Sequence, residues 1–190
     1  MAMLVVGSVG TISGVFMATA TNERLGEVRR RIAHLEMTVQ RGTAEARPRM
    51  QRYINTLRRD EESALASARE WAAAVDERLE QLSNELELAE HRVAAEFAAT
   101  EDQFTATLTA ELHCWDVYLD RMQTTAAAKT GVARDRAEAA IADLRRRRVS
   151  IGSSFSDVGT AAGDGWRGAK ARVLAELDEL KSQADEAWQY

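Results

Sequence analysis

Residues that make turns are scarce in this chain, which has one proline and 11 glycines among its 190 residues. A β-sandwich or a Rossmann-type domain needs turn residues at short intervals, so both are excluded. The single cysteine, Cys114, excludes an internal disulfide and a cysteine-based metal framework. It also suits a reducing compartment, and we expect a cytoplasmic protein.

Alanine and charged residues are abundant instead. The chain has 34 alanines, and its charges nearly balance at a net −5. Balanced charge and periodic apolar residues argue against disorder. Residues 49–130 contain no glycine and no proline, and as one straight helix they would extend over ~120 Å. The sequence leaves open whether this run is one rod or a hairpin.

Apolar residues recur at alternating steps of three and four, the spacing of a coiled-coil seam. We call these residues the seams. They are Leu25, Val28, Ile32, Leu35 and Val39; Val75, Leu79, Leu82, Leu86, Ala89 and Val93; Phe97, Phe104, Leu108, Leu112, Trp115, Leu119 and Met122; and Val173, Leu177, Leu180 and Ala184. The third seam uses more steps of four, which favours a straighter or locally right-handed crossing.

Charge is arranged in blocks along the chain. Residues 21–60 carry a net charge of +5, residues 61–120 carry −12, and residues 121–150 carry +5. Docking the acidic block against the basic ones relieves its self-repulsion, so we expect antiparallel packing. Thr100–Gln103 matches a capping box, which would allow a second reversal there.

These patterns divide the chain into four parts. Residues 1–20 form an apolar tail outside the fold, and residues 21–151 form a long helical coiled-coil region with a turn or kink near 42–48. Residues 152–165 form a Gly/Ser-rich linker. Residues 166–190 form an amphipathic helix. The predicted fold class is therefore all-α, either an antiparallel coiled-coil hairpin or an elongated three- to four-helix bundle.

The first twenty residues contain no charged side chain and have three interpretations. A secretory signal would explain the apolar run, but a basic start is missing. A membrane anchor would need a longer apolar stretch without Ser, Thr and Gly. We prefer a tail, or initiation at Met17.

Residues with metal-binding or catalytic chemistry form no recognised motif in the sequence. None of His34, His91 and His113 is followed by a ligand residue four positions later, and neighbouring His113 and Cys114 face different sides of a helix. Two sets of carboxylates fit solvated helix faces better than a di-iron site: Glu85, Glu87 and Glu90, and Asp116 and Asp120. Glu111 lies two residues before His113, so it does not form the Glu-x-x-His motif of a di-iron site. We therefore predict no catalytic, cofactor or metal site, and no enzyme.

Arg145–Arg148 is the sharpest local feature. Four consecutive arginines point to every side of a helix, and the spacing places Arg148 on the seam, where its stem would snorkel. A phosphate or anionic-lipid contact is conceivable for such a run, but no continuous basic face or aromatic interleaving accompanies it. We therefore disfavour nucleic acid as a partner. Four tryptophans fall near seam positions and suit either wide points between helices or a membrane interface: Trp71, Trp115, Trp166 and Trp188.

Three segments carry a resemblance to known proteins: TNERLGEVRRRIAHLE, ELHCWDVYLDRMQ and AEAAIADLRRRR. They resemble a loosely defined group of bacterial long-helix coiled-coil proteins, some of them described as stress-response proteins and compared in shape with apolipoprotein bundles. The resemblance covers residues 21–190 and implies a stress-related role. It supplies no catalytic or ligand residue.

Together these features predict a non-enzymatic coiled-coil interaction or scaffold protein. We expect it to self-associate or to bind another helical protein, because exposed apolar stripes mark partner surfaces. The alternative is an amphipathic-helix protein that binds lipid surfaces reversibly.

Overall fold

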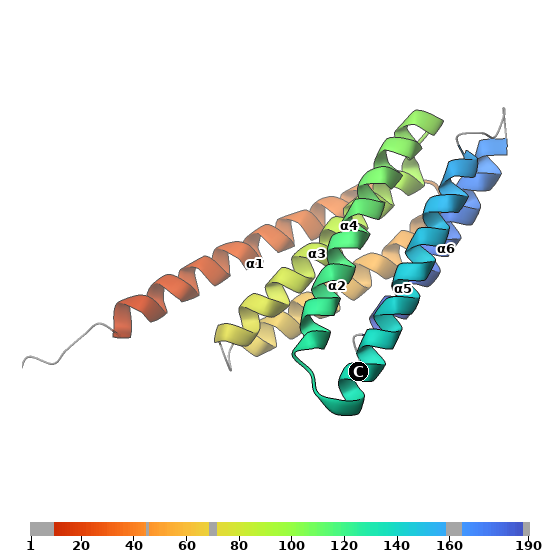
Figure 1. Ribbon diagram of the computed structural model, residues 1–190. Helices are drawn as coiled ribbons and strands as arrows, with labels where there is room; N and C mark the ends of the chain where they lie inside the picture. The colour runs from red at the N-terminus through yellow and green to blue at the C-terminus, as the bar shows by residue number, and fades with distance from the viewer. Residues whose placement is uncertain (1–9, 45, 69–71, 159–164, 188–190) are drawn as a thin grey trace, which may run out of the picture. The chain divides into compact units, whose positions relative to one another are not determined.

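The computed structural model describes residues 10–44, 46–68, 72–158 and 165–187 of the chain (Figure 1). Over these residues every regular element is an α-helix, so the predicted all-α fold is confirmed. The helices are α1 (Gly10–Gln40), α2 (Ala46–Ala68), α3 (Ala72–Phe97), α4 (Glu101–Ala127), α5 (Gly131–Val158) and α6 (Gly165–Ala187).

Two compact units make up the chain. Unit 1 is residues 1–89 and holds α1, α2 and most of α3. Unit 2 is residues 90–190 and holds the end of α3 with α4, α5 and α6. The boundary falls inside α3, which is one continuous helix across it.

In unit 1, α1 and α2 pack side by side and run antiparallel. Arg29 of α1 pairs with Glu61 of α2 at 2.5 Å, and Glu36 pairs with Arg58 at 2.6 Å. Residue numbers therefore increase along α1 in the direction in which they decrease along α2, as antiparallel packing requires. The seam residues of α1 are all buried. Arg29 lies in the basic block and Glu61 in the acidic one, but Glu36 and Arg58 both lie in the basic block 21–60, so the ion pairs of unit 1 do not simply follow the charge blocks.

The chain reverses between α1 and α2 at the position of Gly42 and Pro48. α1 ends at Gln40, and the Gly42 N–H donates back to a carbonyl in the last turn of α1 at 3.0 Å. Thr43 Oγ1 accepts a hydrogen bond from the N–H of Ala46, the first residue of α2. Pro48 is the third residue of α2, where a missing N–H removes no bond within the helix.

The run 49–130 is neither one rod nor a single hairpin, because it contains three separate helices: most of α2 and the whole of α3 and α4. α4 begins after Thr100, whose Oγ1 accepts from the Gln103 N–H at 3.3 Å. The Gln103 side chain in turn accepts from the Ala99 N–H at 3.1 Å. The cap predicted at Thr100 is therefore present, although Gln103 accepts from Ala99 rather than from the N–H of Thr100 itself, as a full capping box would require. The next break lies at Gly131, whose φ of +57° is a left-handed conformation that favours glycine.

Lys170 of α6 holds the end of α3 in unit 2. Its Nζ donates to the carbonyls of Glu96 and Ala98, both at 2.9 Å. The same ammonium lies 5.5 Å from the ring centroid of Phe104 and 5.9 Å from that of Trp166. Burial lowers the pKa of Lys170. This cation satisfies carbonyls that the last turn of a helix leaves without partners.

The predicted linker 152–165 is wrong in its first half, because α5 continues to Val158. Ile151 and Val158 are seven residues apart and both are buried, so an apolar seam continues through the glycine and the serines. Two serine hydroxyls in this stretch donate to carbonyls one helical turn earlier. Residues 159–164 lie outside the described residues.

The start of α1 also differs from the expectation of an apolar tail. α1 begins at Gly10, so residues 10–20 are part of a helix rather than separate from the fold. They contain no proline, and the helix that follows them is already formed, so extending it to these residues avoids the cost of nucleating a new helix. Residues 1–9 lie outside the described part of the chain.

Candidate functional site

The four arginines of Arg145–Arg148 each pair with a carboxylate of unit 2. The partners are Asp120 for Arg145 (2.7 Å), Asp143 for Arg146, Glu179 for Arg147 (2.8 Å) and Asp116 for Arg148 (2.5 Å). Arg148 also donates to the Leu112 carbonyl at 3.2 Å, and it is half-buried, as the prediction of a seam position requires. The run therefore joins α5 to α4 and α6.

A buried guanidinium lies between α3 and α6. Arg92 is only 1% exposed, and its Nε and Nη2 donate to Asp178 at 3.1 and 2.8 Å. Nη2 also donates to the Leu174 carbonyl at 2.8 Å. Nη1 lies 3.7 Å from Glu96 on its own helix. A buried charge needs such partners, because removing it from water is costly.

Glu111 of α4 adds a carboxyl group to this interior. It is 2% exposed, and its Oε2 has no hydrogen-bond partner among the described residues. Burial raises its pKa to about 7; the charge of Arg92 opposes that rise and Asp178 reinforces it. Burial therefore favours the protonated, uncharged form of the Glu111 carboxyl. Neither charge is recognisable as buried from the sequence, because no motif singles out Arg92 and Glu111 forms no Glu-x-x-His motif with His113.

The tryptophans that can be placed lie in different surroundings. Trp115 is buried in α4 and meets Tyr118 edge-on, with ring centroids 5.5 Å apart. Its position agrees with the prediction of a wide point between helices. Trp166 is half-buried beside Lys170. Trp71 and Trp188 lie outside the described residues.

The structure brings Cys114 close to a histidine of another helix. His91 on α3 and Cys114 on α4 place a ring nitrogen and the thiol sulfur within 4.8 Å of each other. Both side chains are half-buried. His113, the sequence neighbour of Cys114, is exposed, and so is His34. The histidine that the structure places near the thiol is therefore His91 rather than its sequence neighbour.

The remaining carboxylates considered in the sequence have separate roles. Glu85 is buried and accepts from the Gln81 amide at 3.1 Å, so its assignment to a solvated face is wrong. Glu87 is exposed one turn before His91 on the same helix. Glu90 is half-buried.

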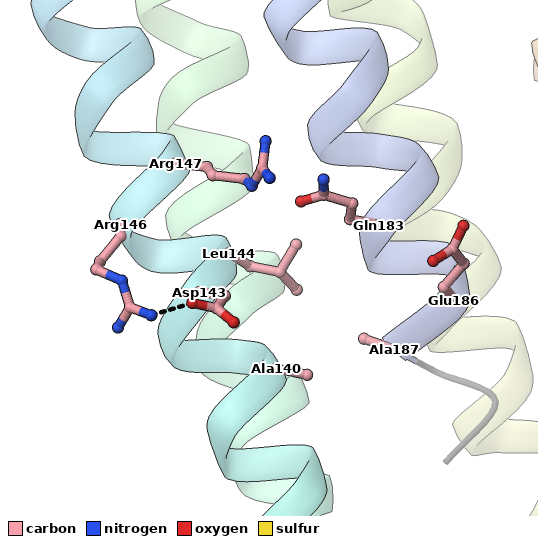
Figure 2. A pocket seen from close by; sticks show the side chains of 8 residues that line it. All are labelled: Ala140, Asp143, Leu144, Arg146, Arg147, Gln183, Glu186 and Ala187. Atoms are coloured by element: carbon pink, nitrogen blue, oxygen red, sulfur yellow. Dashed lines mark hydrogen bonds and ion pairs between the residues drawn. The ribbon is translucent and has the colours of Figure 1, made fainter.

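A groove of about 490 Å³ runs between α5 and α6. Figure 2 shows Leu144 and Arg147 on one side of it and Gln183, Glu186 and Ala187 on the other. Both signs of charge line the groove, and Arg147 is paired with a carboxylate of α6. The lining has no nucleophile with an adjacent base.

None of the described helices combines the length and the apolar character that crossing a membrane requires. Comparisons with family models, with curated proteins and with solved structures gave no match for this chain.

Proposed function

We propose that this chain is a non-enzymatic interaction protein that associates through the first turns of α1. The observation that carries the proposal is the length of α1 relative to its neighbours in unit 1. α1 has 31 residues, whereas α2 has 23. In Figure 1 the first turns of α1, in red, extend past the end of α2 and the start of α3.

The side-chain contacts of unit 1 give the size of this extension. Leu25 of α1 packs with Ala64 of α2 and Leu79 of α3, which places the three helices at one level. From that level α3 continues seven residues back to Ala72, whereas α1 continues fifteen residues back to Gly10. At 1.5 Å per residue the difference is about 12 Å of helix.

The chemistry of this extension favours a helical partner. Residues 10–22 contain no charged side chain, and they include Ile12, Val15 and Phe16. In water, a helix end of this composition gains free energy by burying apolar surface against another helix. A second copy of the chain offers the same uncharged segment, which makes self-association the simplest form of the proposal.

The seams themselves do not supply this partner surface. From the sequence we expect exposed apolar stripes, but the described seam residues of α1 and of α6 are buried within the single chain. Among the residues whose burial the structure describes, the large apolar side chains that remain exposed are scattered over three helices: Met37, Val117, Val132 and Val149. Scattered residues of this kind are ordinary on protein surfaces.

Charge placed in the extension tests the proposal. We expect the native chain to sediment as a dimer or larger assembly at tens of micromolar, and a Val15→Glu/Phe16→Glu variant to sediment nearer the mass of one chain, 21.0 kDa. Met37→Glu is the matched control, because Met37 is on the same helix and is 53% exposed. A native chain that remains monomeric, or equal dissociation of both variants, contradicts the proposal.

A lipid surface is the second candidate, and the same uncharged segment supports it. Glu23 and Glu27 separate that segment from Arg29 and Arg30, and these arginines pair with Glu61 and Glu27. The support for lipid therefore comes from the uncharged segment itself, which suits an apolar insertion. Flotation with anionic vesicles separates the candidates. Co-flotation of the native chain, lost in Val15→Glu/Phe16→Glu, would favour lipid; the helical-partner proposal expects the native chain to stay at the bottom of the gradient.

The stress-related role implied by the resemblance, and the cytoplasmic location expected from the single cysteine, remain parts of this proposal.

A further inference from the structure

We propose that His91 and Cys114, with Glu87, form a binding site for a zinc ion. His91 and Cys114 come from α3 and α4 of unit 2, and their ligand atoms lie within 4.8 Å of each other. Glu87 is four residues before His91, so on the continuous helix α3 it lies one turn away on the same face. Its carboxylate oxygen is within 4.8 Å of the His91 ring nitrogen.

The spacing fits a tetrahedral ion after small side-chain movements. Zn–N bonds of about 2.1 Å and Zn–S bonds of about 2.3 Å place neighbouring ligand atoms roughly 3.5 Å apart. Each side chain would therefore move by about 1 Å or less. The thiol and the imidazole are half-buried and the carboxylate is exposed, so an ion can reach them from solvent.

The ligand set selects the metal. Thiolate and imidazole ligands favour zinc over magnesium or calcium, which prefer oxygen. A thiolate and a carboxylate carry two negative charges and the imidazole none, which balances Zn²⁺. A fourth position is left for water, as in zinc sites with three protein ligands.

The chain's single cysteine gives the test a unique reporter. A chromogenic disulfide reagent reports only the Cys114 thiolate, and zinc coordination removes that thiolate from reaction. We expect Zn²⁺ at tens of micromolar to slow the reaction of the native full-length chain about tenfold or more, if the dissociation constant is near 1 μM.

Variants of the ligand residues and of a nearby histidine distinguish coordination at this site from nonspecific binding of Zn²⁺ elsewhere on the chain. His91→Gln should abolish the protection by Zn²⁺, and Glu87→Gln should weaken it several-fold. His113→Gln is the matched control, since His113 adjoins Cys114 and is exposed, and it should keep the protection. Unchanged reactivity of the native chain with Zn²⁺, or equal protection in His91→Gln and the native chain, overturns the proposal.

Cobalt provides a measurement that does not depend on any variant. Co²⁺ in a thiolate site gives a sulfur-to-metal charge-transfer band in the near ultraviolet. We expect this band in the native chain, with loss on adding excess Zn²⁺. A native chain saturated with Co²⁺ that shows no such band also overturns the proposal.

Discussion

Glu111 is a carboxyl group in the interior of unit 2, where burial raises its pKa from 4.5 to about 7. The groups that act on it are Arg92 on α3 and Asp178 on α6. Between these two pKa values the folded chain binds more protons than the unfolded chain. The free energy of unfolding therefore decreases as pH rises through this range, because the ionised carboxylate is poorly solvated.

Replacing Glu111 with glutamine should remove this pH dependence. Near pH 4.5 and below, Glu111→Gln and the native chain should unfold with similar free energies. Above about pH 7 the variant should be more stable, by roughly 3 kcal/mol at most. Urea unfolding followed by circular dichroism across this pH range measures the difference. Glu186→Gln, at an exposed carboxylate, is the control and should run parallel to the native curve; a parallel curve for Glu111→Gln would contradict the prediction.

The pairing of His91 with Cys114 shows what the sequence could and could not reveal at single residues. The sequence places Glu87 four residues before His91, a spacing that brings both to one face of a helix but forms no recognised metal motif by itself. The thiol comes from another helix, and nothing in the sequence alone joins α3 to α4 at that register. Arg148 differs, because its seam position follows from helical spacing and is confirmed by its burial and its bond to Leu112.

At the scale of elements, the start of α4 depends on a side-chain cap. Thr100→Ala removes the oxygen that accepts from the Gln103 N–H, and we expect a loss of about 1 kcal/mol in the free energy of unfolding. Thr107→Ala is the matched control. Its hydroxyl donates to a carbonyl inside α4, so alanine should cost nothing or stabilise the helix slightly. Denaturant unfolding measures both, and equal losses would argue against the cap.

The helices themselves could be predicted in type more reliably than in extent. Periodic apolar residues and scarce turn residues predicted an all-α chain, and the capping box predicted the break at Thr100. The linker prediction was wrong for residues 152–158, because it was based on their glycine and serine content. The seven-residue spacing of Ile151 and Val158, also visible in the sequence, indicates instead that the helix continues. The packing of both residues stabilises the last turns of α5 despite its glycine.

At the scale of the whole molecule, the apolar seams and the extension of α1 have different roles. The described seam residues of α1 and α6 are buried within the chain, so they hold its own helices together. The uncharged turns at Gly10–Ala20 reach beyond their neighbours in unit 1. Sequence periodicity does not distinguish an internal seam from a partner surface, because both have the same spacing; our proposal of a partner surface on α1 draws instead on the helix lengths and contacts of unit 1.

Concentration-dependent hydrogen exchange read by mass spectrometry tests this central claim most directly, because it locates the association on the chain. The account predicts that amides in residues 10–20 exchange more slowly as protein concentration rises, while those of α5 are unchanged. Exchange in residues 10–20 that does not depend on concentration, or protection that develops on α5 instead, would contradict it.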